Sequence, residues 1–330
     1  MKTIFFGTQP YDRESFDRIN ADYGIRIKYH RSHLNIDNVP LAQGADAVCI
    51  FVNDSADAPT VGELARMGVR LIALRCAGFN NVDLKAAAEH GITVVRVPAY
   101  SPYAVAEHAV ALMLSLNRKV HRAYWRTRDG NFALHGLLGF DMHGKTAGIV
   151  GTGKIARALI RILRGFGMEV LGYDPCPDEA FARESGMTYV PLTELYRRSD
   201  IISLHCPLTD RTLHMIDAEA IGQMKDGVII INTGRGQLIR TSDLIEGLKE
   251  KKIGAAGLDV YEDEDGQVFE NFSDDVLRNE IVPVLMSFPN VVVTSHQAFF
   301  TRTALQSIAI TTMENARAFA LGEKLVNEVK

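Results

Sequence analysis

The chain has 330 residues, 47% of them hydrophobic, and its formal net charge at pH 7 is -4. This length predicts two domains with sizeable cores, and the absence of a lysine- or arginine-rich block argues against a nucleic-acid partner. The four cysteines lack the spacing of a metal-binding finger, and a chain this long needs no disulfides. We therefore expect free thiols, no metal site and a cytoplasmic protein.

Short apolar runs alternate with stretches of helical spacing over the N-terminal third of the chain. This alternation predicts an α/β domain with a mostly parallel sheet. The predicted strands are 3–7, 25–29, 47–52, 69–75 and 92–97, and the predicted helices are 61–67 and 84–90. The first run lacks the features of a signal peptide, and the apolar segment 104–116 is shorter than a membrane span, so no membrane contact is expected.

A long helix is predicted to begin at Ser101-Pro102 and to run to about residue 128, because serine suits the N-cap and proline the first helical position. A second alternation follows from Gly144. Its predicted strands are 146–150, 169–173, 200–204, 228–232, 255–259 and 291–294, and its predicted helices are 154–165, 217–224 and 242–250. Residues 263–289 are predicted to form a long, acidic, irregular loop, and a final helix is expected over 304–319.

The strand 146–150 runs directly into a G-x-G-x-x-A turn that begins at Gly151. Gly151 permits the tight turn, Gly153 lets the backbone approach a pyrophosphate, and Asp174 ends the next strand, where it would accept hydrogen bonds from a ribose. A ligand-free βα turn is the alternative, but strand, turn, helix and acid together favour a dinucleotide. No arginine occurs in 175–177 to hold a 2′-phosphate, so NAD is expected.

The glycine turn lies in the middle of the chain, which predicts a discontinuous partner domain. We expect two doubly wound parallel-sheet domains with a substrate cleft between them. A flavodoxin-like substrate domain would comprise 1–100 and 299–330, and a Rossmann NAD domain would comprise 101–298.

Three residues that follow predicted strands have the chemistry for reducing a keto acid. Arg235 offers a planar fork to a carboxylate, His296 can donate a proton, and Glu264 can keep that histidine protonated. Each also has an ordinary interpretation: a surface arginine, a core histidine and a solvated acidic loop. Ligands bind at the carboxyl ends of strands in open α/β sheets, which favours the functional interpretation.

The sequence resembles the D-isomer-specific 2-hydroxyacid dehydrogenase family over essentially its whole length, and within it the fermentative D-lactate branch. The stretches that carry the resemblance are 77–83 (AGFNNVD), 106–109 (AEHA), the glycine turn with Asp174, 205–209 (HCPLT), 233–236 (TGRG), 258–262 (LDVYE) and 296–299 (HQAF). The lactate branch is indicated by Tyr100-Ser101-Pro102, by the long insert after Glu264 and by Phe299.

The resemblance implies an NAD-dependent enzyme that reduces pyruvate to D-lactate. Arg235 would bind the carboxylate, His296 would be the proton donor and Glu264 would favour its protonated form. The residues implied to line the NAD site are Gly151, Gly153, Lys154, Ile155, Asp174, Cys206, Pro207, Thr212, Thr233, Gly234, Arg235 and Asp259. The residues implied to contact substrate are Ala77, Gly78, Phe51, Tyr100, Arg235, His296 and Phe299. Many relatives have serine or alanine in place of Gly234.

Two other functions stay open at this point. One is a dehydrogenase for bulkier keto acids, such as phenylpyruvate or 2-ketoisocaproate, and the other is an NAD(H)-sensing regulator on the same fold. His205 and the Glu107-His108 pair are not assigned catalytic roles. The resemblance also implies a homodimer or homotetramer, and the handedness of the product rests on the resemblance alone.

Overall fold

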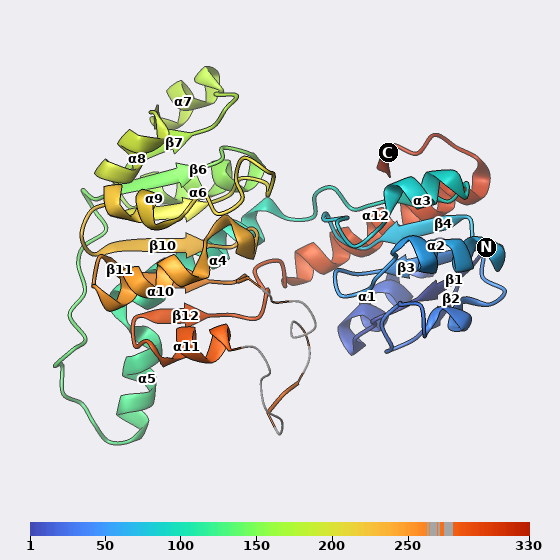
Figure 1. Ribbon diagram of the computed structural model, residues 1–330, viewed down its shortest axis with the longest axis horizontal. Coiled ribbons are helices and arrows are strands. Elements are labelled where there is room, and N and C mark those ends of the chain that lie inside the picture. The colour runs from blue at the N-terminus through green and yellow to red at the C-terminus, as the bar shows by residue number, and fades with distance from the viewer. Residues whose placement is uncertain (263, 265–268, 270, 274–279) are drawn as a thin grey trace. The chain divides into compact units, whose positions relative to one another are not determined.

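The computed structural model describes residues 1–262, 264, 269, 271–273 and 280–330. It divides the chain into two compact units, which we call unit 1 (Met1–Ser101 with Phe300–Lys330) and unit 2 (Pro102–Phe299) (Figure 1). No helix within the described ranges is long and apolar enough to cross a membrane.

Unit 1 contains a six-stranded sheet in the order β13-β5-β4-β3-β1-β2. Its strands are β1 (Lys2–Phe5), β2 (Arg26–Tyr29), β3 (Ala47–Ile50), β4 (Leu71–Leu74), β5 (Thr93–Val95) and β13 (Glu328–Val329). The first five are parallel and β13 runs antiparallel to β5. The order 2-1-3-4-5 is that of flavodoxin-like folds, which place ligands where the strand order reverses, here between β1 and β3.

Helices cover both faces of this sheet. They are α1 (Pro10–Asn20), α2 (Ala58–Arg66), α3 (Leu84–Glu89) and α12 (Arg302–Leu321), with a short 3-10 turn, η1 (Val39–Ala42). Helices α2 and α3 share one apolar core with the strands, while α12 packs on β4 and against α1. Sequence reasoning missed α1, because its buried residues Asp12, Ser15 and Phe16 include a single apolar side chain.

The described part of unit 2 forms a seven-stranded sheet in the order β12-β11-β10-β9-β6-β7-β8, with all neighbours parallel. Its strands are β6 (Thr146–Val150), β7 (Glu169–Tyr173), β8 (Thr188–Tyr189), β9 (Ile201–Leu204), β10 (Val228–Asn232), β11 (Ile253–Leu258) and β12 (Val291–Val293). Counted from β6, the order is the 3-2-1-4-5-6 of a Rossmann fold with one strand added, and it reverses between β6 and β9.

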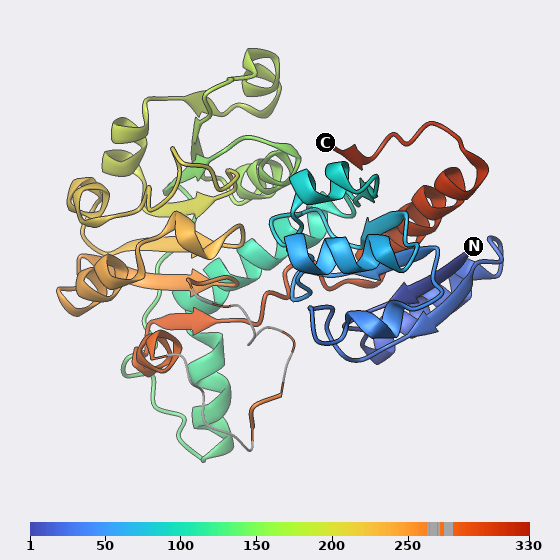
Figure 2. The same cartoon turned by 45° about the vertical axis from the view of Figure 1, so that its right-hand side comes forward.

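The helices of unit 2 also lie on both faces of its sheet (Figure 2). They are α4 (Pro102–Arg118), α5 (Val120–Arg128), α6 (Lys154–Gly165), α7 (Glu179–Ser185), α8 (Leu192–Arg198), α9 (Ala218–Gln223), α10 (Thr241–Lys249) and α11 (Ile281–Ser287), with a 3-10 turn, η2 (Gly236–Leu238). Helices α4 and α6 build one apolar core with the strands, and α8, α9 and α10 build a second. The two doubly wound parallel sheets expected from the sequence are therefore confirmed.

Two expectations about helices were wrong. The single helix over 101–128 is two helices, because Lys119 has a left-handed backbone with φ of +51° and separates α4 from α5. The acidic stretch 263–289 is not wholly irregular, since α11 buries Val282 and Leu285 at helical spacing. Residues 263, 265–268, 270 and 274–279 of that stretch lie outside the described residues.

Candidate active site

The glycine turn after β6 leaves a helix N-terminus open to an anion. Gly151 has φ of +86°, and a Cβ there would lie 2.7 Å from the backbone nitrogen of Cys206, which follows β9. Gly153 caps α6 without a side-chain hydrogen bond, and a Cβ built on it would meet no heavy atom within 4 Å. No described residue accepts a hydrogen bond from the N–H of Lys154 or Ile155, at the start of α6, which suits a phosphate.

The Asp174 carboxylate is fixed at the end of β7 by three hydrogen bonds. Oδ2 accepts from the backbone N–H of Thr152 at 2.8 Å and from its hydroxyl at 3.0 Å, and Oδ1 accepts from the N–H of Cys176 at 2.9 Å. Partial burial opposes ionisation, but these bonds outweigh it and lower the pKa of Asp174 below its ordinary value. Arg157 is close enough to contribute, yet its guanidinium is bound by the Thr152 carbonyl and by Asp178.

The loops beside the glycine turn offer a second test of whether a dinucleotide fits. The Thr233 hydroxyl is buried and has no hydrogen-bond partner among the described residues. A buried hydroxyl of this kind is suited to a bound ligand. The Thr212 hydroxyl instead accepts from the N–H of Thr209 and donates to the Pro207 carbonyl, so it stabilises the turn after Cys206. The open helix N-terminus, the fixed acid and the unpartnered hydroxyl together fit NAD.

Arg235 lies in a turn after β10 that Asn232 holds from both sides. The Asn232 amide accepts from the N–H of Gly234 at 3.0 Å and donates to the carbonyl of Arg235 at 2.9 Å. A Cβ on the next residue, Gly236, would lie 2.0 Å from the Tyr261 carbonyl oxygen, so the turn packs directly on the segment that leads to Glu264. Sequence reasoning missed Asn232, although asparagine before a glycine-containing turn is a signal for this motif.

His296 and Glu264 form the expected pair. The Nδ1 atom of His296 lies 3.0 Å from Oε1 of Glu264, and the two side chains are 22% and 17% exposed. An ionised carboxylate only accepts, so Nδ1 carries a proton and Nε2 is left for a substrate. The other Glu264 oxygen, Oε2, is buried and has no hydrogen-bond partner among the described residues. His296 has φ of +52°, and the Phe269 ring lies 6.1 Å from both His296 and Phe299.

Asp259 holds the loop that carries His296. Asp259 is fully buried, with 0% of its surface exposed. Its carboxylate accepts from the Thr294 hydroxyl at 2.5 Å and from the N–H groups of Gln297 and Ala298 at 2.9 and 2.8 Å. Its carbonyl accepts from the N–H of His296 at 2.9 Å. Burial would raise the pKa of the Asp259 carboxyl, but its hydrogen bonds outweigh burial and lower that pKa. Direct contact of Asp259 with NAD stays a prediction.

In unit 1, backbone N–H groups form a candidate site for an anion after β4. No described residue accepts a hydrogen bond from the N–H of Ala77 or Gly78, and both residues are half-buried. The Ala77 carbonyl accepts from Arg96 at 2.8 Å, which fixes the orientation of this segment. Two adjacent N–H donors of this kind suit a carboxylate.

Phe51, after β3, is held on both of its backbone atoms. Its N–H donates to Asp54 at 2.5 Å, and its carbonyl accepts from Asn81 at 2.8 Å. The buried guanidinium of Arg75 lies 5.0 Å from the centre of its ring. Tyr100 is half-buried beyond β5. Nothing in the sequence marked Asp54 or Arg75, because charged residues are rarely fully buried.

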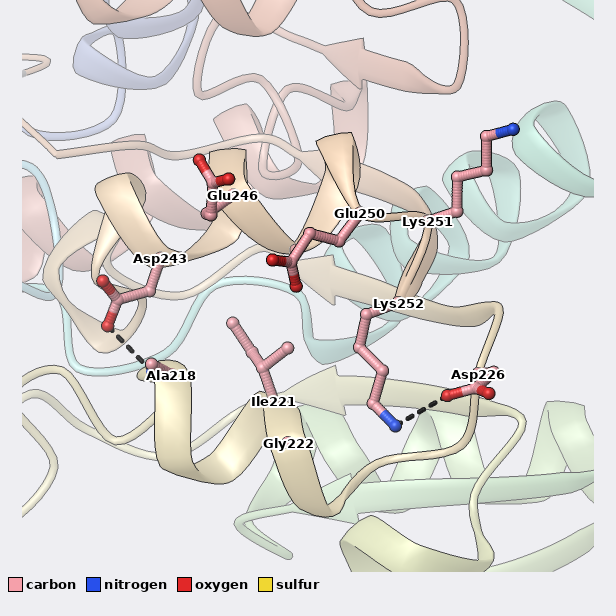
Figure 3. A pocket seen from close by; sticks show the side chains of 10 residues that line it. Ala218, Ile221, Gly222, Asp226, Asp243, Glu246, Glu250, Lys251 and Lys252 are labelled. Carbon is pink, nitrogen blue, oxygen red and sulfur yellow. Dashed lines mark hydrogen bonds and ion pairs between the residues drawn. The ribbon is translucent and has the colours of Figure 1, made fainter.

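A surface pocket between α9 and α10 is not this site (Figure 3). Its lining includes Asp226, Asp243, Glu246 and Lys252, with Lys252 bonded to Asp226 and Asp243 bonded to the N–H of Ala218. Asp226 and Lys252 precede β10 and β11, so the pocket lies at the amino edge of the sheet. Arg235, Glu264 and His296 follow β10, β11 and β12, at the carboxyl edge.

The chain is similar to known dehydrogenases over its whole length. Residues 110–298 match the family model described as D-isomer specific 2-hydroxyacid dehydrogenase, NAD binding domain. The chain is 50% identical to a D-lactate dehydrogenase of Escherichia coli over 100% of both chains. It is 44% identical to the solved pyruvate reductase of Chlamydomonas reinhardtii, with a TM-score of 0.94 over 99% of this chain and 98% of that one. A solved D-2-hydroxyisocaproate dehydrogenase is 30% identical, with a TM-score of 0.87 over 100% and 99%.

Proposed function

The chain belongs to the D-isomer specific 2-hydroxyacid dehydrogenase family, and from that premise we propose that it reduces pyruvate to D-lactate with NADH. The full-length similarity to a D-lactate dehydrogenase and to a pyruvate reductase supports this substrate. The observation that carries the proposal is the His296–Glu264 pair, 3.0 Å apart, on loops at the carboxyl edge that also presents Arg235.

Each of these side chains has one task. NADH, when bound, would supply the hydride for C2 of the keto acid. Arg235 holds the carboxylate with its planar fork, and the N–H groups of Ala77 and Gly78 are proposed as further donors to it. His296 gives the proton on Nε2 to the carbonyl oxygen as negative charge develops there, and Glu264 stabilises the imidazolium before the transfer.

The cofactor is NADH in preference to NADPH, because the ionised Asp174 would repel a 2′-phosphate. Arg157 does not compensate, since Asp178 binds its guanidinium at 2.8 Å. Asp174→Ala should lower kcat/KM for NADH and reduce the preference for NADH over NADPH. Measurement of kcat/KM with each of the two cofactors tests this. Equal efficiency of the wild-type enzyme with NADPH would contradict this assignment.

We propose that three aromatic side chains limit the size of the substrate. Phe51, Tyr100 and Phe299 are proposed to surround C3 of the substrate and to leave room for little more than a methyl group. Rates of NADH oxidation with a panel of keto acids test this: kcat/KM should be higher for pyruvate than for phenylpyruvate or 2-ketoisocaproate. Phe51→Leu should shift the ratio toward the bulkier acids while NADH binding stays unchanged. If the wild-type enzyme preferred phenylpyruvate, the assigned substrate would change from pyruvate to a bulkier keto acid. The proposed hydride chemistry would not change.

A second copy of this chain is the proposed partner. Helix α5 has no buried residue, and large apolar side chains are exposed on it and on the loop that follows. The exposed side chains are Val120, Tyr124, Trp125, Phe132, Leu134 and Leu138. A group of exposed large apolar side chains in one segment is typical of an interface, so we propose a homodimer or a pair of dimers. We place it in the cytoplasm, where the cysteines stay reduced. Trp125→Glu should lower the mass measured by light scattering.

A further inference from the structure

His108 is a polar side chain of α4 whose surroundings the sequence left unexplained. Its Nε2 atom lies 3.1 Å from the hydroxyl of Thr294 and 3.3 Å from Oδ1 of Asp259, and its side chain is 17% exposed. Thr294 is two residues before His296. The Asp259 carboxylate accepts from the Thr294 hydroxyl, before His296, and from the N–H of Gln297, after it. The contact therefore joins α4 to the loop that carries the proton donor.

The hydrogen bonds determine which ring nitrogen of His108 carries a proton. Thr294 gives its single hydroxyl proton to Asp259 at 2.5 Å, so its oxygen can only accept from His108. The other neighbour of Nε2 is an ionised carboxylate, which also only accepts. Nε2 of His108 must therefore be a donor, shared between the Thr294 hydroxyl and the Asp259 carboxylate.

This donor matters because Asp259 is completely buried. A buried carboxylate is stable only when donors surround it, and removal of one donor leaves an oxygen under-solvated in a medium of low dielectric constant. The same carboxylate fixes the N–H groups of Gln297 and Ala298, and His296 between them and Thr294 has a left-handed backbone, with φ of +52°. A non-glycine residue keeps that conformation only when its surroundings impose it.

We propose that His108 is a positioning residue for the proton donor: through Asp259 and Thr294 it holds the His296 loop in the conformation that pairs His296 with Glu264. The proposal rests on the proposed function in one respect, that His296 donates the proton. His108 itself is assigned no contact with the substrate.

The test replaces the ring by side chains that keep or lose a donor at the position of Nε2. His108→Gln retains a donor there and His108→Leu does not. We expect His108→Leu to lower kcat with pyruvate about tenfold or more, the size of effect that a small misplacement of a reacting group produces, with NADH Kd unchanged. His108→Gln should recover most of that loss. A purely structural role would lower the melting temperature of both variants and leave kcat, measured well below it, unchanged.

Thr294 supplies a second, independent pair of variants. Thr294→Ser keeps the bridging hydroxyl and should behave as wild type, whereas Thr294→Val should lose kcat as His108→Leu does. The double variant His108→Leu/Thr294→Val should be no slower than the slower single variant, because both act through one contact. The exposed His90 of unit 1 provides the control, and His90→Gln should change nothing.

A readout without catalysis separates this inference from the proposed function. In protein labelled with 15N at histidine, the ring resonances of His296, identified by their loss in His296→Ala, should shift in His108→Leu and return in His108→Gln. Unshifted His296 resonances, or a folded His108→Leu variant with wild-type kcat, would overturn the role of His108. A wild-type protein that reduces no keto acid, but shows the resonance shifts, would refute the proposed function and leave the positioning role in place.

Discussion

The glycine turn after β6 and the His296 loop after β12 lie at the carboxyl edge of the same sheet, yet they are built in opposite ways. The first depends on backbone conformation: Gly151 has φ of +86°, and Gly153 leaves the N-terminus of α6 open. The second depends on side chains from distant segments, since His296 pairs with Glu264 and its loop is held by Asp259.

This difference separates two kinds of site. A site for a phosphate can be made from N–H groups of consecutive residues, so a short sequence pattern specifies it. A proton donor needs a partner that sets its protonation state and a scaffold that fixes its direction, and those groups need not be neighbours in the chain. Substitutions in the first region should therefore weaken NADH binding, and those in the second should lower kcat.

Loss of the proton donor should have the largest effect. His296→Ala should lower kcat with pyruvate by about 100-fold or more, the usual size of a general-acid effect, because no other group is assigned to protonate the developing alkoxide. NADH Kd, followed by nucleotide fluorescence, should stay at the wild-type value. A kcat within a few-fold of wild type would remove His296 from the role of proton donor.

Substitutions in the glycine turn should weaken the binding of NADH. Gly151→Ala places a Cβ 2.7 Å from the backbone nitrogen of Cys206 at a φ of +86°, so it should lower the melting temperature and weaken NADH binding tenfold or more. Gly153→Ala is the matched comparison, since its Cβ meets no protein atom within 4 Å. Gly153→Ala should have the melting temperature of the wild-type protein and should still bind NADH more weakly. Wild-type affinity in Gly153→Ala would exclude a close approach of the cofactor to this residue.

The pair formed by His296 and Glu264 should set the pH dependence of reduction. Glu264→Gln keeps an oxygen that can accept from Nδ1 of His296 but removes the negative charge that favours imidazolium. Reductase activity should therefore be lost at lower pH in the variant than in the wild-type enzyme. Profiles of kcat/KM against pH for the two proteins measure the displacement, and superimposable profiles would separate Glu264 from this role.

His205, which follows β9 and whose backbone lies against the glycine turn at Gly151, gives the smallest expected effect. Burial lowers the pKa of His205 to about 4, and its Nε2 lies 2.8 Å from the Ser203 hydroxyl. The unfolded chain therefore binds a proton at this residue from below about pH 6.5, while the folded chain binds it only near pH 4, so the folded state loses stability as the pH falls between these values. His205→Gln should lower the slope of unfolding free energy against pH by at most about 1.4 kcal/mol per unit.

Denaturant unfolding at pH 7, 6 and 5 measures that slope. Because His205 stays neutral over this range, the variant should also leave the pH profile of reduction unchanged, in contrast to Glu264→Gln. A shifted pH profile of reduction in His205→Gln would show that His205 also affects the titration that controls activity. It would contradict the assignment of that titration to His296 and Glu264 alone.

The sequence predicted the parts of this protein whose physical cause is local. Alternating apolar runs specify strands and helices, and the strand-turn-helix around Gly151 with Asp174 specifies a dinucleotide site, because neighbouring residues create both features. The same reasoning failed at Lys119, whose left-handed backbone divides a helix, and at α1, whose buried face is mostly polar. Hydrophobic periodicity predicts neither feature, because neither leaves a repeating apolar pattern in the sequence.

The candidate site was predicted from the sequence as a set of residues, and only the tertiary structure decided which of them are partners. The pairing of His296 with Glu264 and the packing of Gly236 on Tyr261 arise because β10, β11 and β12 are neighbours in the sheet. The contact of His108 with Thr294 crosses 186 residues of chain. The order of residues along the chain does not predict such a contact. The buried charge of Asp259 and the donors that stabilise it come from elements that meet only after folding.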